Sequence, residues 1–329
     1  MTSDSQATQE PTALKRRVNK AVKTIRAPKT LLCALMLSVM PVGSVVRPVA
    51  AAGQTDLYGG IGRGSPLNAG ALITVDQETG VGTLVGHPDS VPGLTGLVFD
   101  ISGTLYGTTI SGTLGTGRFS ELVRIDPGTG AQIGPAVTIT ANDLPISITD
   151  LALQPGTNTL YGTSLSEDDF INSIYTIDPA TGVATLIGRT GVIGATIAFG
   201  PDGTLYQTSA VFDDVGFVAG YLNTLDPQTG AVLATSDPFT TEHVGGLAVR
   251  PTDGVIFASG GDAGRLWILS PSGTQTFLGL TSVGGVGDLA FTPLSSSKAD
   301  CKNGGWQRFS FPFSFKNQGD CIQFVNTGK

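Results

Sequence analysis

The body of this chain lacks lysine. Between Gly53 and Ser297 there is none, and six arginines stand against 18 aspartates and four glutamates. A protein that binds nucleic acid needs a basic surface to neutralise phosphates, and anionic membranes attract the same kind of surface. The sequence therefore argues against nucleic acid and anionic membranes as partners, whereas its acidity favours cationic ones, including metal ions.

Residues that commonly carry catalysis are also scarce. The chain has two histidines, His87 and His243, and three cysteines. The histidines lack the spacing of zinc ligands, and neither a Gly-x-Ser-x-Gly elbow nor a Gly-Lys-Ser/Thr phosphate loop occurs. These absences disfavour serine or cysteine hydrolases, zinc enzymes and nucleotide-binding proteins.

Basic residues gather instead near the N-terminus. Seven occur between Lys15 and Lys29 with no acidic residue, and an apolar run from Leu31 to Val46 and the small residues Ala50 to Ala52 follow. This order is typical of a secretory signal peptide. We therefore expect a Sec-type leader over residues 1–52 and a secreted, extracellular protein. The apolar run is shorter than the ~20 residues that a membrane-spanning helix needs, so no span is expected after cleavage.

Removal of the leader reveals the charge of the mature chain. Of the 329 residues 277 remain, and they carry 11 basic and 24 acidic residues, a formal net charge of −13. A single all-β domain of this length is ordinary and buries a large core.

An internal repeat dominates the rest of the sequence. The second strand of each unit carries a Leu-Tyr-Gly motif or a variant, with its aromatic residue spaced by 48, 55, 45 and 51 residues. Each unit continues with an apolar run that ends in Asp-Pro or a variant, and a Thr-Gly or Ser-Gly turn follows. A third apolar run comes next, and a fourth apolar run such as Leu-Ala-Phe completes the unit. The five aromatic positions are Tyr58, Tyr106, Tyr161, Tyr206 and Phe257.

Four short strands per unit of about 45–50 residues are typical of a propeller blade. Glycine and proline punctuate the chain too often for helices. We therefore predict an all-β, five-bladed β-propeller over residues 53–293, with four-stranded blades. The last strand is expected to complete the first blade, and the repeated tyrosines to pack between blades.

The units resemble the blades of NHL-type and related extracellular bacterial propellers. The resemblance rests on Gly-Leu-Ala-Phe, Pro-Asp-Gly-Thr-Leu-Tyr and Asp-Pro-x-Thr-Gly, and it covers about residues 56–293. It implies that the Gly-Leu-Ala-Phe strand is innermost and lines the central channel. Such propellers serve as binding scaffolds, structural surface proteins and occasionally enzymes, so the resemblance specifies the fold rather than the function.

A different kind of segment follows. Residues 294–300 are a serine-rich linker, and residues 301–329 hold two cysteines, Cys301 and Cys321. An even pair in an exported chain predicts a disulfide, and therefore a small disulfide-closed tail. The pattern Cys-Lys-Asn-Gly-Gly-Trp…Cys resembles a short tail at the ends of diverse exported bacterial proteins.

Aspartates supply the one candidate metal site. Asp150 and Asp288 occupy the same repeat position, just before the innermost strand, where other units carry glycine or threonine. They are expected at one mouth of the channel, where carboxylate oxygens suit Ca²⁺. Alternatively, each aspartate hydrogen-bonds its own turn.

Further acidic residues mark the loops on the same face. Glu167, Asp168, Asp169, Asp213 and Asp214 fall between the second and third strands of neighbouring units, and His243 precedes an innermost strand. These residues are candidates for binding a ligand, although the sequence favours a solvated acidic loop over a binding site.

The sequence therefore favours a secreted, non-enzymatic binding or scaffold protein that uses a loop-rich acidic face. The partner is an unidentified protein, a glycan or the cell envelope. The alternative is a metal-dependent hydrolase similar to gluconolactonase-type propellers, with a divalent cation at the channel mouth. That family needs a glutamate and asparagines around its metal, and the matching positions here are glycine, threonine and aspartate.

Overall fold

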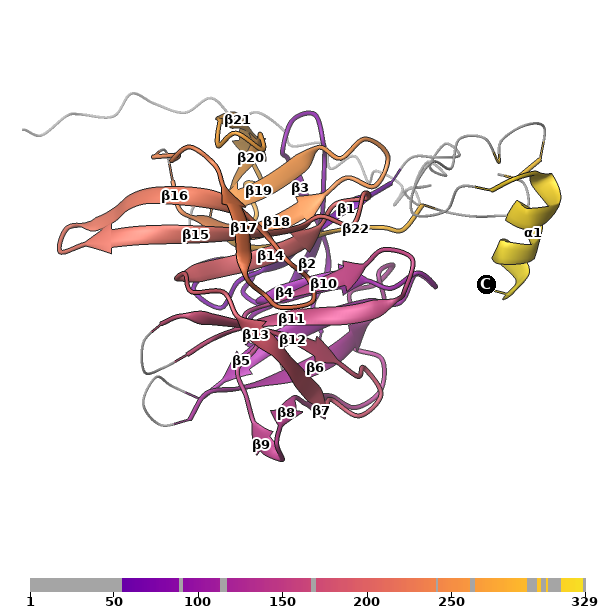
Figure 1. Ribbon diagram of the computed structural model, residues 1–329, viewed down its shortest axis with the longest axis horizontal. Coiled ribbons are helices and arrows are strands. Elements are labelled where there is room, and N and C mark those ends of the chain that lie inside the picture. Colours follow the sequence, from indigo (N-terminus) through magenta and orange to yellow (C-terminus); the bar gives the residue numbers. More distant parts are fainter. Residues whose placement is uncertain are drawn as a thin grey trace, which may run out of the picture. The chain divides into compact units, whose positions relative to one another are not determined.

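A computed structural model describes residues 55–327, apart from 89–90, 113–116, 167–169, 241, 261–263, 295–300, 303–305 and 307–314. The chain forms five four-stranded antiparallel sheets, which are the blades of a β-propeller (Figure 1). The predicted fold class is thereby confirmed. The expected leader lies outside the described residues, as do Glu167, Asp168 and Asp169 and most of the linker.

Each blade runs from an innermost to an outermost strand. Blade 1 is β22 (Val286–Phe291), β1 (Leu57–Ile61), β2 (Leu72–Val75) and β3 (Gly82–Gly86). Blade 2 is β4 (Gly96–Phe99), β5 (Leu105–Ser111), β6 (Phe119–Ile125) and β7 (Val137–Thr138). Blade 3 is β10 (Asp150–Gln154), β11 (Thr159–Leu165), β12 (Asn172–Ile177) and β13 (Ala184–Arg189).

Blades 4 and 5 follow the same order. Blade 4 is β14 (Gly194–Phe199), β15 (Leu205–Asp213), β16 (Gly216–Leu225) and β17 (Val232–Thr235). Blade 5 is β18 (Val244–Val249), β19 (Ile256–Gly260), β20 (Arg265–Leu269) and β21 (Gln275–Leu280). Between blades 2 and 3 lies a small hairpin, β8 (Thr140–Ala141) and β9 (Leu144–Pro145).

The ring closes through the ends of the propeller sequence, as predicted. β1 pairs with β22 so that Leu57 lies opposite Phe291. The pairing continues beyond the strands, where the amide of Asp56 donates to Thr292 Oγ1 (2.8 Å) and the amide of Thr292 donates to the Asp56 carbonyl (2.9 Å). The innermost strand of blade 1 is therefore the last strand of the propeller to be synthesised.

The repeated aromatic residue of the second strand packs against the next blade. Tyr58 meets Phe99 edge-on at 5.3 Å between ring centroids, and Tyr161 meets Phe199 at 5.0 Å. Phe257 makes the equivalent contact with Phe291 of blade 1 at 5.3 Å. These edge-to-face contacts explain the repeat of the motif as packing between blades.

A repeated glycine allows the outermost strands to approach the next blade. A Cβ atom on Gly86, Gly188 or Gly279 would overlap the carbonyl oxygen of a threonine in the neighbouring Thr-Gly turn. These threonines are Thr129, Thr229 and Thr79. The glycine is therefore a packing requirement of the repeat.

The outermost strands also share a β-bulge. In blade 1 Ile73 pairs with Leu84 and Leu72 with Gly86, so that Val85 is left out of the ladder. Ile187 in β13 and Leu278 in β21 are skipped in the same way. A bulge twists an edge strand and interrupts its free hydrogen-bonding row, which protects the edge against pairing with other chains.

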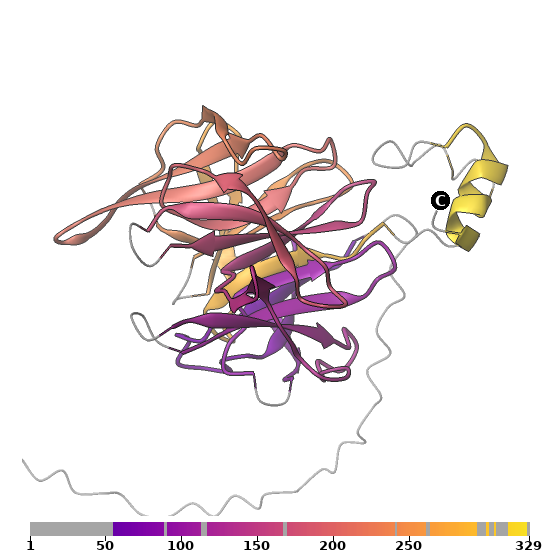
Figure 2. The ribbon, with the colours of Figure 1, turned by 60° about the horizontal axis from the view of Figure 1, so that its bottom comes forward.

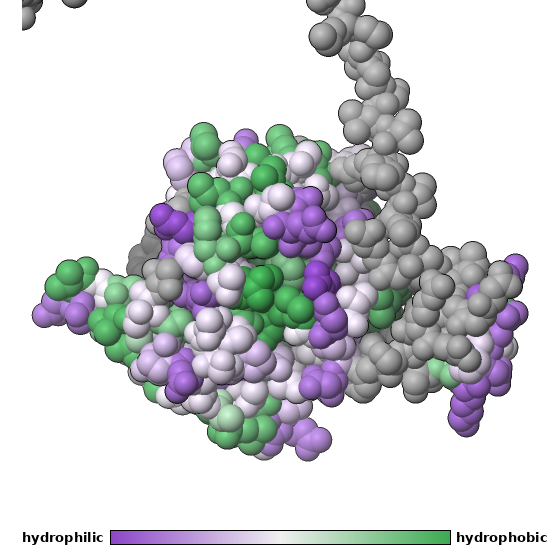
Figure 3. All heavy atoms as spheres, turned by 90° about the horizontal axis from the view of Figure 1, so that it is seen from above, coloured by the Kyte–Doolittle hydropathy of each residue, from purple (hydrophilic) through white to green (hydrophobic). Residues whose placement is uncertain are grey.

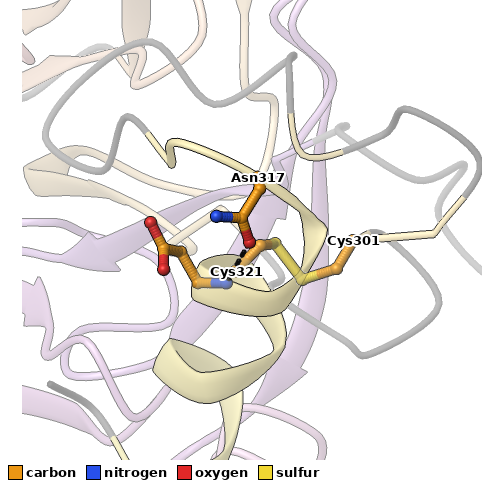
Figure 4. Close-up of a disulfide and its surroundings, with 4 residues drawn as sticks. Cys301, Asn317 and Cys321 are labelled. Carbon is orange, nitrogen blue, oxygen red and sulfur yellow. Dashed lines mark hydrogen bonds between the residues drawn. A yellow bond between two sulfur atoms is a disulfide. The ribbon is translucent and has the colours of Figure 1, made fainter.

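The tail contains the predicted disulfide and an unexpected helix. Cys301 and Cys321 are bonded, with their Cα atoms 5.6 Å apart (Figure 4). Helix α1 (Gln318–Thr327) begins after Asn317, whose Oδ1 accepts the amide of Asp320 (3.0 Å). The expectation that helices are absent was wrong here, because an asparagine N-cap supports a local helix. No helix within the described part of the chain is long and apolar enough to span a membrane.

Candidate functional site

Asp150 is the first residue of the innermost strand β10, and Asp288 is the third residue of the innermost strand β22. Both side chains are buried, with 1% and 0% of their surface exposed, and their carboxyl groups are hydrogen-bonded to each other. The two residues come from blades 1 and 3, which are separated in the ring by blade 2. The structure therefore brings the predicted pair together, but inside the channel rather than at an open mouth.

Backbone amides from all five blades point at this carboxyl pair. Asp288 accepts the amides of Leu97 (2.5 Å) and Leu247 (3.4 Å), and also that of Leu289. Asp150 accepts the amides of Ile197 (2.7 Å) and Leu151 (2.7 Å), and the hydroxyl of Thr196. These five amides occupy the same repeat position, one from each innermost strand.

This ring of amides explains how two carboxyl groups tolerate burial. A buried carboxylate is costly unless hydrogen bonds or charges compensate it. Five convergent N–H dipoles stabilise negative charge, and the hydrogen bond between the carboxyl groups requires one shared proton. The pair therefore closes the channel as a unit that carries about one negative charge.

Burial favours the protonated form of both carboxyl groups. Burial raises the pKa of Asp150 to about 6, with the hydrogen bonds that it accepts opposing that rise. Burial raises the pKa of Asp288 well above its usual value, and the adjacent Asp150 charge raises it further. The pair therefore holds a proton more tightly than an exposed aspartate does.

The predicted Ca²⁺ site at this pair stays a prediction. Among the residues that the structure describes, no group of three or more His, Cys, Asp or Glu side chains could hold a metal ion. The amide ring favours negative charge at this position, and a cation would have to displace the shared proton. The amide ring and the shared proton both weaken the expected affinity of the pair for a divalent ion.

Next to the pair, the innermost strands surround an apolar well. Its walls come from the innermost strands of all five blades, and prolines that follow those strands surround its mouth, namely Pro155, Pro201, Pro251 and Pro293. The cavity volume is about 160 Å³, and no charged residue lines it. Sequence reasoning named the strands but not this cavity, because a repeat does not show how closely the strands approach the axis.

Asp213 and Asp214 stand at the end of the longest hairpin. Strands β15 and β16 extend beyond the neighbouring strands of the propeller (Figures 1 and 2). Asp213 Oδ1 accepts the amides of Val215 (2.8 Å) and Gly216 (3.0 Å), which closes the turn. The sequence predicted a long loop here, whereas the structure continues the ladder to the turn itself.

His243 anchors this hairpin to the propeller. Its ring lies 5.7 Å from Phe212 and 6.1 Å from Phe217, measured between centroids. Burial lowers the pKa of His243, with the neighbouring charge of Glu242 opposing the change. Glu242 is itself held by Arg265 at 3.0 Å. The predicted ligand residue His243 therefore has a packing role in the structure.

Exposed apolar side chains collect on the hairpin and on other loops of the same face. Val215 is 95% exposed at the turn, and Val211, Phe212 and Val218 are also exposed. In Figure 3 the projecting end of the molecule shows hydrophobic residues beside hydrophilic ones. Further exposed apolar residues lie in the connections between blade strands or between blades, with Leu144 in the small hairpin strand β9: Leu67, Leu144, Phe170 and Ile193.

Comparison with known proteins gives no family. No family model matches the sequence, and no curated protein does. A chain from a crystal structure of a nidogen–laminin complex is 15% identical, with a TM-score of 0.47 and coverage of 74% of this chain and 100% of that chain.

Two gluconolactonase structures are similarly distant. A putative gluconolactonase is 19% identical (TM-score 0.43), covering 72% of this chain and 82% of its own. The gluconolactonase of Xanthomonas campestris is 13% identical (TM-score 0.42), covering 72% and 83%. We draw no functional argument from likeness at these TM-scores.

Proposed function

We propose that this chain is an exported binding protein that holds a protein partner on its loop face, with the β15–β16 hairpin at the centre of contact. The observation that carries the proposal is the end of this hairpin, which places the 95%-exposed Val215 beyond the propeller. Apolar side chains presented together on an otherwise polar surface mark interaction sites.

The construction of the hairpin supports a binding role. The packing of Phe212, Phe217 and His243 holds its sides, and Asp213 closes its turn through two hydrogen bonds. A surface that is ordered before binding loses less conformational entropy on association. The exposed carboxylates of Asp213 and Asp214 favour a partner with cationic groups around an apolar pocket.

Site-specific photo-crosslinking tests this function. A photoreactive phenylalanine analogue at Val215 should give a defined protein adduct when the exported protein is irradiated among its natural neighbours. The control position is Leu233, which is 68% exposed on the outermost strand β17. Adducts that form equally at both positions, or none at Val215, would contradict the proposal.

Export itself has a separate test. The leader expected over residues 1–52 should be absent from the protein recovered outside the cytoplasm. N-terminal sequencing should then begin at Gly53. A retained leader would contradict export by cleavage at this position.

A further inference from the structure

The apolar well in the channel has the features of a small-molecule site that is separate from the hairpin. All five blades contribute to its wall through equivalent residues of their innermost strands, such as Leu151, Ile197, Leu247 and Leu289. Each of these four is at most 2% exposed. The well is therefore built into the rigid centre of the fold and does not depend on a loop closing over it.

The carboxyl pair closes one end of this well. The amides that Asp150 and Asp288 bind belong to Leu97, Leu151, Ile197, Leu247 and Leu289, and the same five residues line the well. The carboxyl groups themselves are not part of the lining. A ligand that enters from the proline-bordered mouth thus meets apolar residues and backbone polar atoms, and no charged side chain.

The volume and the apolar lining of the well restrict the size and polarity of a ligand that it can bind. Its volume is about 160 Å³. An apolar protein cavity of ~150 Å³ binds benzene or xenon, so a well of this volume can hold a group of that size. We propose that the well binds one uncharged apolar group, a single aromatic ring or a short branched alkyl chain, either as a free molecule or as the end of a larger ligand that extends through the mouth.

Four alanine methyl groups make the proposal directly testable. Ala152, Ala198, Ala248 and Ala290 line the well, one in each of blades 3, 4, 5 and 1. Ala210 and Ala219 are also buried, at 8% exposure each, but lie outside it in β15 and β16. Mature protein labelled with ¹³C at its alanine methyl groups therefore reports on both places in one spectrum.

Benzene is the probe, with pyrazine as a polar ring of nearly the same shape. Saturable shifts of the four lining methyl resonances with benzene, absent for Ala210 and Ala219, are the expected result. Pyrazine at equal concentration should give much smaller shifts, because its nitrogen atoms lose their hydrogen bonds to water. Equal shifts at all six alanines, or none at the four, would overturn the proposal.

A charge at the mouth provides the matched variant. Leu153 lines the well and is partly exposed, so Leu153→Asp places a carboxylate beside the ligand. It should weaken benzene binding by at least about tenfold, whereas Leu233→Asp on the outer rim should leave it unchanged. A melting curve of each variant without benzene verifies folding. Undiminished binding in a folded Leu153→Asp protein would place benzene elsewhere and contradict the assignment.

Discussion

Asp150 and Asp288 owe their chemistry to the backbone around them rather than to their own side chains. Three of the five equivalent positions in the ring are glycine or threonine, so the repeat itself does not require a carboxyl group there. Where aspartate does occur, it accepts amides from its own blade and from neighbouring blades. A single side chain therefore ties separate blades together.

The pair makes stability depend on pH in a defined direction. The folded protein binds the proton more tightly than the unfolded chain, because the pKa of Asp150 rises from 3.8 to about 6 and that of Asp288 also rises. Between about pH 4 and pH 6 these two groups hold fewer protons in the unfolded chain, so their contribution to the free energy of unfolding falls as pH increases. The Asp150 shift alone corresponds to about 3 kcal/mol.

Replacing Asp288 with asparagine removes the contribution of one member of the pair. Asparagine imitates the protonated carboxyl, since its amide donates to Asp150 without titrating. We expect the melting temperature of Asp288→Asn to change less than that of the wild type between pH 4 and pH 7. Asp76, Asp178 and Asp226, whose pKa values are lowered by hydrogen bonds, titrate below this range in both proteins. Parallel melting curves would show that the pair does not share a proton.

Calcium provides the complementary prediction at the same residues. Because five amides already direct positive dipoles at the carboxyl groups, we expect the melting temperature to be the same with calcium and with a chelator. Elemental analysis of the exported protein checks the result independently. One bound ion per chain together with a chelator-dependent melt that Asp288→Asn abolishes would restore the predicted cation site.

For single residues, the sequence indicated which repeat position carries the aspartates, but not how their side chains interact. Repeat alignment placed Asp150 and Asp288 just before their innermost strands, whereas Asp150 is the first residue of β10 and Asp288 lies within β22. It could not show that their side chains turn into the channel and meet across blade 2, since that depends on the distance between strands that are far apart in sequence. Glu167, Asp168 and Asp169 fall outside the described residues, so their predicted role stays a prediction.

Among the elements, the outermost strands place a β-bulge and a packing glycine at adjacent residues. The glycine that admits the neighbouring Thr-Gly turn follows directly after the bulged residue, as Gly86 follows Val85 and Gly279 follows Leu278. The bulge protects the free edge and the glycine packs the blades. The Thr-Leu-Val-Gly and Thr-Phe-Leu-Gly segments therefore specify a bulge and a contact between blades as well as a strand.

Gly279→Ala tests the packing part of this device. The new methyl group would overlap the Thr79 carbonyl where blade 5 meets blade 1, and overpacking of this kind costs about 1–3 kcal/mol. Gly128→Ala is the matched control, because the only atom near its Cβ is Asp126 Oδ1 at 3.2 Å. Denaturant unfolding should show a large loss for the first variant and little for the second. Equal losses would contradict the packing role.

Sequence reasoning underestimated two elements for related reasons. Asp213 and Asp214 were assigned to a loop, yet Val211, Phe212 and Phe217 continue the β15–β16 ladder up to a turn closed by Asp213. Helix α1 was missed because the composition of the propeller was extended to the tail. The Asn317-x-x-Asp320 pattern is the local signal that would have indicated it.

For the whole molecule, the number of blades followed directly from the repeat. Five aromatic positions gave five units, and the frame of the first and last strands gave the closure of blade 1. What the repeat could not provide is the interior that the blades enclose. The volume of the apolar well depends on how all five blades pack together, and so does the convergence of five amides on the carboxyl pair. Neither can be predicted from the sequence of a single unit.

Ring closure leads to a clear prediction for truncated chains. A chain that ends after Gly285 lacks β22, so blade 1 loses its innermost strand and the channel loses Asp288. We expect this chain to show no cooperative thermal unfolding. A chain that ends after Leu294 retains all five blades and should melt cooperatively, as circular dichroism can establish. Cooperative melting of the shorter chain would refute the need for closure.

The pairing of β1 with β22 also sets the order in which the protein can be completed. The ribosome delivers the chain from its N-terminus, so β1 emerges before its partner strand β22 has been synthesised. Until Val286 arrives, one edge of blade 1 is open, and the amides of Leu97 and Leu247 lack their carboxyl acceptor. A chain interrupted anywhere before that residue exposes the features that proteases and chaperones recognise. The position of β22 therefore delays closure of the ring until the end of the propeller sequence has been synthesised.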